Sequence, residues 1–180
     1  MESTTVGLSM AGIGLLVARL VLGLLMAAHG TQKLFGWFGG YGLKNTGEFF
    51  VQLGFRPGRL FATAASIGEV TSGLLLALGL LGPVGPALMI SVMIVAAFSV
   101  HWQNGVFAAS NGIELPLLYA ASALGLALVG PGLYSLDALL GITHLWTPAL
   151  TATVLAAGIV GGFANLLARR SVKREAKLSS

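Results

Sequence analysis

Five long stretches of apolar residues are the feature that most constrains the fold of this chain. An α-helix needs roughly 20 apolar residues to cross the hydrocarbon core of a bilayer, where every backbone polar group must be satisfied within the protein. The stretches lack the alternation of apolar and polar residues that a membrane β-barrel requires. With 56% hydrophobic and 9% charged residues, the chain could not cover a soluble globule with polar surface. The predicted membrane-spanning helices are about 10–35, 60–81, 84–101, 113–129 and 146–168, the fourth being the weakest.

Positive charge is distributed unevenly along the chain, and this asymmetry predicts its orientation. Nine Lys and Arg residues flank the connection 36–59 or follow the fifth predicted helix, whereas the N-terminal tail, the turn at Gly82 and the segment 130–145 carry none. Cytoplasmic loops of membrane proteins are enriched in Lys and Arg. We therefore expect the N-terminus outside and the C-terminus in the cytoplasm, which requires all five spans.

The net charge of +4 comes from the C-terminal tail, because residues 1–168 carry five cations and five anions. A basic cluster directly after a membrane helix is typical of contact with anionic lipid headgroups. We expect no nucleic-acid binding from this pattern. The chain contains no cysteine, which excludes disulfides, thiolate metal ligands and dithiol redox chemistry within it. Any redox role therefore needs a bound cofactor or a partner.

Four ionisable residues lie within the first two predicted spans: Arg19, His29, Lys33 and Glu69. A charge at this depth costs about 2.5–3.5 kcal/mol unless it is paired or hydrated, so these side chains should face the bundle interior. At 100° per residue the first three share one face of the first helix. Glu69 lies roughly 14 Å above the cytoplasmic end, His29 roughly 9 Å and Arg19 roughly 24 Å. Depth therefore favours Arg19 or His29 as the partner of Glu69.

Two interpretations of these charges remain open: an ion pair that only fixes helix register, and the polar lining of an intramembrane cavity for a headgroup, a quinone or a proton. His101 and Glu114 are weaker candidates for the same cavity, and the capping-box spacing from Asn111 to Glu114 favours a capping role. We predict no metal site. Haem held by His29 and His101 is an alternative, but their predicted depths differ, so we expect a colourless protein.

Smaller patterns predict helix ends and helix contacts. Gly158 and Gly162 have GxxxG spacing, which indicates either a homo-oligomer seam or packing against the other helices of the chain. A short surface helix is predicted at 48–53. Ser135 and Asp137 are placed to cap another short helix.

Three motifs in the chain resemble the DoxX family of small bacterial membrane proteins. They are ARLVLGLLMAAHGTQKLFG in the first predicted helix, GEVTSGLLLALGLL in the second, and ELPLLYAASALGLALVGPGLYSLDALLG from the fourth helix onward, together spanning residues 18–141. The resemblance implies a four-helix membrane core related to the DoxX and DoxD proteins, the latter linked to a thiosulfate:quinone oxidoreductase. The recurring polar positions of the family correspond to Arg19, His29, Lys33, Glu69, Glu114, Ser135 and Asp137.

The predicted fold class is therefore an all-α membrane protein, with a DoxX-type four-helix transmembrane bundle at 1–141, an additional transmembrane helix at 142–168 and a basic cytoplasmic tail at 169–180. The leading functional hypothesis is a non-autonomous subunit or quinone-like binding component of redox metabolism in the bacterial plasma membrane. It would be at most an accessory subunit of a membrane oxidoreductase, with a membrane or cytoplasmic redox protein as partner. The alternatives are a structural scaffold without substrate and, more remotely, a small carrier.

Overall fold

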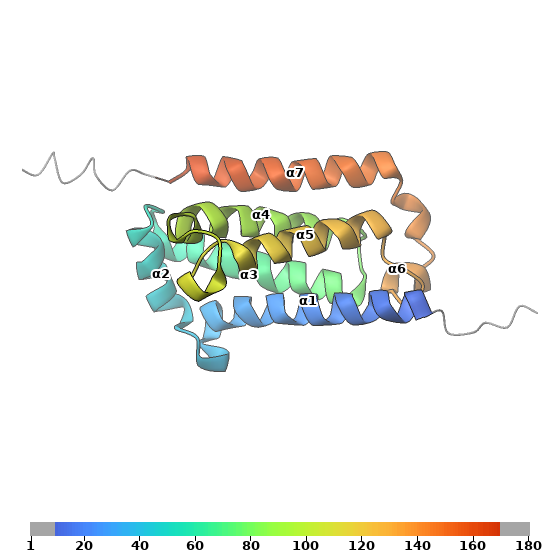
Figure 1. Cartoon of the computed structure of the whole chain (residues 1–180), viewed down its shortest axis with the longest axis horizontal. Helices are drawn as coiled ribbons and strands as arrows, with labels where there is room; N and C mark the ends of the chain where they lie inside the picture. Colours follow the sequence, from blue (N-terminus) through green and yellow to red (C-terminus); the bar gives the residue numbers. More distant parts are fainter. Residues whose placement is uncertain (1–9, 170–180) are drawn as a thin grey trace, which may run out of the picture.

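The protein is a bundle of helices that alternate in direction (Figure 1), in a computed structural model that describes residues 10–169. The five long helices are α1 (Met10–Phe35), α3 (Gly58–Leu78), α4 (Val84–Ala96), α5 (Glu114–Val129) and α7 (Pro148–Leu167). Each runs opposite to the long helix before it, and no strand occurs between residues 10 and 169. The all-α fold class is therefore confirmed.

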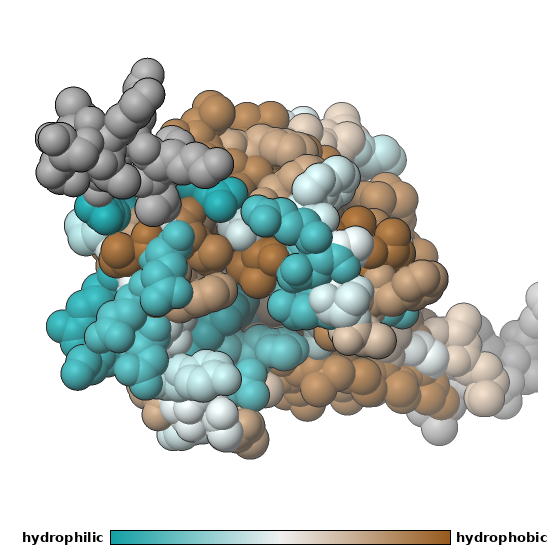
Figure 2. Space-filling view, turned by 60° about the vertical axis from the view of Figure 1, so that its left-hand side comes forward, coloured by the Kyte–Doolittle hydropathy of each residue, from teal (hydrophilic) through white to brown (hydrophobic). Residues whose placement is uncertain are grey.

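The two ends of the bundle differ in chemistry, and we call them the α2 end and the α6 end. The α2 end carries α2 (Gly42–Gln52), and the α6 end carries α6 (Leu136–Leu139) together with the turn between α3 and α4 (Figure 1). Figure 2, turned to bring the α2 end forward, shows hydrophilic residues gathered over that end and hydrophobic residues beside them along the bundle. The surface helix predicted at 48–53 is thus part of a longer helix at the polar end.

Four helical segments are long enough and apolar enough to cross a membrane. They are Met10–Phe35, Gly58–Leu78, Val84–Asn104 and Pro148–Leu167. The fourth predicted span corresponds to α5, whose 16 residues extend about 24 Å at 1.5 Å per residue. It runs between the same two ends as its neighbours. The outward face of α1 exposes large apolar side chains such as Val17, Val21 and Leu24, as a surface in contact with lipid requires.

Helices α1 and α3 contact each other through backbone atoms. A Cβ atom added to Gly23 or to Gly73 would overlap the carbonyl oxygen of the other residue. Farther along, Gly30 lies against the backbone of Ser66 in the same way. Small residues allow this close approach. The resulting antiparallel register places Glu69 near the level of Gly30 and well away from the level of Gly23.

Helix α7 lies against α4, and its two spaced glycines make the contact. A Cβ atom at Gly158 would overlap the carbonyl oxygen of Ala87, and one at Gly162 would lie 2.9 Å from the carbonyl oxygen of Ser91. The GxxxG motif therefore packs α7 onto its own chain, which is one of the two interpretations that the sequence left open. A homo-oligomer seam through these two glycines stays a prediction, and it would require α7 to separate from α4.

Asp137 holds the α6 end together. Its side chain is 0% exposed, and it accepts hydrogen bonds from the backbone N–H groups of Leu81 and Gly82 at 2.8 and 2.7 Å and from the indole Nε1 of Trp146 at 2.7 Å. Ser135 caps α6, as predicted, by accepting a hydrogen bond from a backbone N–H three residues later. Asp137 instead joins the α3–α4 turn to the segment before α7, a role that the capping prediction missed.

The start of α5 differs from the sequence-based expectation. Ile113 is the N-cap residue, and Asn111 has a left-handed backbone conformation with φ of 62°. The Glu114 carboxylate accepts a hydrogen bond of 2.6 Å from the backbone N–H of Ala108, in the loop that precedes α5. The predicted capping box from Asn111 to Glu114 is therefore wrong, because the chain turns at Asn111 before the helix begins.

The predicted basic tail at 169–180 lies, apart from Arg169, outside the described residues. Arg169 donates a hydrogen bond of 2.6 Å from Nε to the carbonyl oxygen of Leu53, just after α2. The first basic residue after α7 is therefore at the α2 end, beside the cations of the first connection.

Candidate functional site

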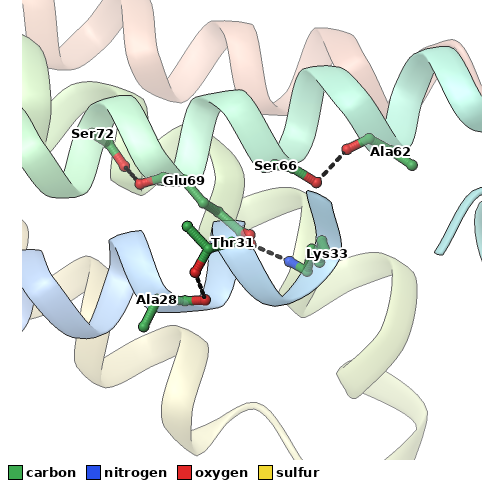
Figure 3. A network of polar contacts seen from close by, with 7 residues as sticks. All are labelled: Ala28, Thr31, Lys33, Ala62, Ser66, Glu69 and Ser72. Carbon is green, nitrogen blue, oxygen red and sulfur yellow. Dashed lines mark hydrogen bonds and ion pairs between the residues drawn. The ribbon is translucent and has the colours of Figure 1, made fainter. Parts of the chain in front are cut away.

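Lys33 of α1 and Glu69 of α3 form an ion pair within the bundle (Figure 3). The Glu69 side chain is 2% exposed and that of Lys33 is 33% exposed. Helical side chains lean toward the N-terminus of their own helix, and α1 and α3 are antiparallel. Lys33 therefore leans into the bundle while Glu69 leans toward the α2 end. The two charged groups meet although Lys33 lies near the end of its helix.

Arg19 does not pair with Glu69. The same lean carries its side chain toward the α6 end, where the guanidinium donates hydrogen bonds to the carbonyl oxygens of Pro131 and Tyr134. Arg19 is 2% exposed, so it is as deeply buried as predicted. The predicted Arg19–Glu69 pair is wrong because the depth ranking used axial position and ignored the direction in which each side chain points.

His29 is also not the partner of Glu69. It is exposed on α1, and its ring lies edge-on to that of Tyr119 of α5, with 6.0 Å between the ring centroids. Its ring therefore packs against α5, whereas the Lys33 side chain, one turn later on the same broad face of α1, reaches Glu69 of α3.

A cavity of about 780 Å³ lies beside the ion pair. Its walls come from α1, α2, α3, α4 with the turn that follows it, and α7. The volume falls within the range typical of small-molecule sites, roughly 300–1,000 Å³. The polar groups on its walls include Lys33, Glu69, Ser99, His101 and Asn165, and its aromatic groups are Tyr41, Phe49, Phe50, Phe55 and Phe61. We call it the Glu69 cavity.

Two buried oxygen atoms on the walls of this cavity have no hydrogen-bond partner among residues 10–169. They are Oε2 of Glu69 and Oγ of Ser99. By contrast, the buried hydroxyls of Ser66 and Ser72 on α3 donate to carbonyl oxygens of their own helix, at 2.6 and 3.1 Å (Figure 3). A buried polar group without a partner costs about 1–3 kcal/mol. An acceptor and a hydroxyl left unpaired beside one cavity are therefore groups that a polar ligand can satisfy.

Ser99 lies in a π-helical turn, Ala97–His101, that continues α4. Such turns widen the helix and are frequent at functional sites. The sequence pattern did not identify Ser99, although hydroxyls within an apolar span, here Ser91 and Ser99, were a usable signal. It also missed Asn165 of α7, which carries no charge.

The two weaker candidate residues, His101 and Glu114, lie in different parts of the structure. His101 lines the Glu69 cavity, and its Nδ1 lies 2.8 Å from the carbonyl oxygen of Asn111. Glu114 accepts a hydrogen bond from the loop before α5 and does not line the cavity.

His29 does not line the Glu69 cavity either, so the two histidines proposed as haem ligands do not face a common space. Within residues 10–169, no group of three or more His, Asp or Glu side chains could hold a metal ion.

Comparison with known proteins identifies the family. The DoxX family profile matches residues 14–102, about half of the chain. The chain belongs to the DoxX family. The match extends from α1 through the π-helical turn after α4, so it includes the ion pair and most walls of the Glu69 cavity, whereas α5, α6 and α7 lie beyond it. No curated protein and no solved structure matches the chain.

With its apolar helices, this DoxX chain is a membrane protein. The third motif of the resemblance, which contains Ser135 and Asp137, falls outside the matched residues. The structure gives those two residues architectural roles at the α6 end, and it brings Lys33, Glu69 and His101 together around one cavity at the α2 end.

Proposed function

We propose that the Glu69 cavity binds a small amphipathic molecule of quinone type, and that the chain is a non-autonomous component of membrane redox metabolism. The observation that carries this proposal is the pair of unpartnered oxygens, Glu69 Oε2 and Ser99 Oγ, on the walls of a cavity of about 780 Å³. A quinone ring has apolar faces and polar oxygens at its edge. The cavity offers surfaces of both kinds.

The polar groups suit both redox forms of such a ligand. The Lys33 ammonium and the Ser99 hydroxyl can each donate a hydrogen bond to a quinone carbonyl oxygen. The free oxygen of Glu69 can accept a hydrogen bond from the hydroxyl of a quinol. Phe49, Phe50 and Phe61 supply the apolar surface against which a ring can lie. Because the chain has no cysteine, electrons would come from the ligand or from a redox partner.

Binding of a short-chain ubiquinone analogue to the protein in lipid nanodiscs tests the proposal. We expect saturable binding by equilibrium dialysis, weakened about two- to twelvefold in Ser99→Ala, since one hydrogen bond contributes about 0.5–1.5 kcal/mol. The stability of this variant should be unchanged, because the Ser99 hydroxyl has no partner to lose.

Ser72→Ala is the matched control, because Ser72 is equally buried but lies outside the Glu69 cavity and is already hydrogen-bonded. It should leave binding of the quinone analogue at the wild-type level. Binding that is equally strong in the wild type and Ser99→Ala would argue against the site. Non-saturable uptake by all three proteins would indicate partition into lipid and would also reject the proposal.

We also propose that the α2 end faces the cytoplasm of a bacterial plasma membrane, with the N-terminus outside. The distribution of Lys and Arg supports this orientation, because nine of them belong to one side of the predicted topology and none to the other. The basic connection 36–59 and the end of α7 both lie at the α2 end. A reporter fused after Ser180 should score cytoplasmic and one fused before Met1 should score external. The same side for both ends would reject five spans, and the reverse assignment would reject the orientation.

A further inference from the structure

A second cavity, of about 710 Å³, lies at the α6 end of the bundle. Its walls come from Arg19 of α1, the α3–α4 turn, the segment 126–133 and the beginning of α7 with Trp146 before it. It shares no wall residue with the Glu69 cavity. We call it the Arg19 cavity.

Arg19 brings an unsatisfied donor to this cavity. Two of its guanidinium nitrogens donate to the carbonyl oxygens of Pro131 and Tyr134. Its Nε is buried and has no hydrogen-bond partner in the described part of the chain. Arginine cannot be deprotonated in a protein, so the charge remains whatever the surroundings. A full positive charge and a free N–H are therefore held at membrane depth, where each is costly.

The nearest acidic group does not satisfy this donor. Asp137 is close enough to act electrostatically on Arg19. Its oxygens, however, accept hydrogen bonds from Leu81, Gly82 and Trp146. Between residues 10 and 169, no carboxylate is hydrogen-bonded to the Arg19 guanidinium, which donates its hydrogen bonds to the backbone carbonyl oxygens of Pro131 and Tyr134.

The rest of the cavity is mostly apolar. Leu75, Leu76 and Leu126 lie on its walls together with Pro83 and Pro86. One buried cation in an apolar hollow matches a ligand with one acidic headgroup and an apolar body. Arginine binds carboxylate and phosphate oxygens more strongly than neutral acceptors, because both partners are charged.

We propose that the Arg19 cavity binds an amphipathic oxyanion, a carboxylate or phosphate headgroup on an apolar body, through the free Nε–H and charge of Arg19. Two sources have this chemistry: a free fatty acid, and an anionic phospholipid of the surrounding membrane. Both would enter from the bilayer, at the level of the α3–α4 turn.

Trp146 provides a reporter for this cavity, because it lies on the cavity wall. The chain has three tryptophans, so Trp37→Phe with Trp102→Phe leaves Trp146 as the single source of indole fluorescence. In detergent micelles, 9,10-dibromostearate should quench this fluorescence saturably, since bromine quenches on contact. The methyl ester of the same acid has the same apolar body without the charge, and should quench at least tenfold more weakly.

The two sources are separated by titrating brominated phosphatidylglycerol beside the fatty acid. Saturable quenching by dibromostearate identifies a fatty acid, and saturable quenching by the phospholipid alone identifies a lipid headgroup. Either result supports an oxyanion site. Equal and saturable quenching by the acid and its methyl ester, or no saturable quenching by any of the probes, would overturn the proposal.

Two further changes in the single-tryptophan protein test the role of Arg19 and of the cavity itself. Arg19→Met should weaken the quenching by the acid at least tenfold. Because this variant also loses contacts to Pro131 and Tyr134, Ala152→Phe serves as a second test. Ala152 is an exposed residue of α7 on the cavity wall, so the larger side chain should fill the cavity and leave Arg19 in place. Unchanged quenching in folded Ala152→Phe would contradict the proposal.

Discussion

Replacing Asp137 by alanine is expected to lower the free energy of unfolding by roughly 3–5 kcal/mol. The buried carboxylate accepts hydrogen bonds from the backbone N–H groups of Leu81 and Gly82 and from the indole of Trp146. Alanine would remove the acceptor of all three donors at once, and it would release the α3–α4 turn from the segment before α7. Reversible unfolding of the purified protein in mixed micelles, followed by circular dichroism, measures the loss.

Two further variants calibrate this result. Asp137→Asn keeps one acceptor oxygen and should fall between the wild type and Asp137→Ala. Glu48→Ala removes an exposed carboxylate of α2 and should change the free energy of unfolding by no more than about 0.5 kcal/mol. If Asp137→Ala costs no more than Glu48→Ala, the contacts of Asp137 do not stabilise the fold.

A double-mutant cycle on Lys33 and Glu69 should show the second largest effect. Lys33→Met leaves the carboxylate of Glu69 buried without its cation, and we expect a loss of roughly 2–4 kcal/mol in the free energy of unfolding. Glu69→Gln removes the charge that Lys33 pairs with. In the double variant no unpaired charge remains, so much of the stability lost in Lys33→Met should return. The same unfolding measurement on the wild type, both singles and the double gives the coupling energy.

The pair Arg19 and Glu69 serves as the comparison for the cycle on Lys33 and Glu69. Since Arg19 and Glu69 have no common partner, Arg19→Met and Glu69→Gln should be additive within about 0.5 kcal/mol. Strong coupling between Arg19 and Glu69, with none between Lys33 and Glu69, would show that the arrangement of charges in Figure 3 is incorrect.

The Lys33–Glu69 double variant also separates the two interpretations of the ion pair. If the pair only fixes helix register, the double variant should recover stability and still bind the quinone analogue as the wild type does. If the pair belongs to a binding site, the double variant should fold but lose binding. The first outcome would reject the proposed function and leave a structural scaffold as the better description.

Much of the fold follows from local pattern. Long apolar stretches with few charges permit little except membrane helices, so the helical class and the approximate limits of α1, α3, α4 and α7 were predictable. The end of α3 was predicted three residues late, because Gly79 adopts a left-handed conformation that terminates the helix. The GxxxG spacing on α7 also indicated a close helix contact correctly, but not which helix would make it.

The candidate site was predictable in its residues but not in its pairing. Intramembrane charges are costly, so Arg19, Lys33 and Glu69 could be identified one by one from the sequence. Their partners depend on the antiparallel register of α1 and α3 and on the lean of each side chain toward the N-terminus of its helix. Because of these geometric factors Glu69 pairs with Lys33, and the Arg19 side chain points to the opposite end of the bundle.

The sequence by itself therefore determined the class of fold and the residues that lipid should not surround, because burial energies depend on residue type. Only the tertiary structure decided that Ser99 and Glu69 face one cavity, that Arg19 lines another, and that Asp137 joins the α3–α4 turn to the segment before α7. Asp137 and Leu81 are 56 residues apart in the chain. A contact of this kind depends on how the helices pack together, and no local pattern contains that information.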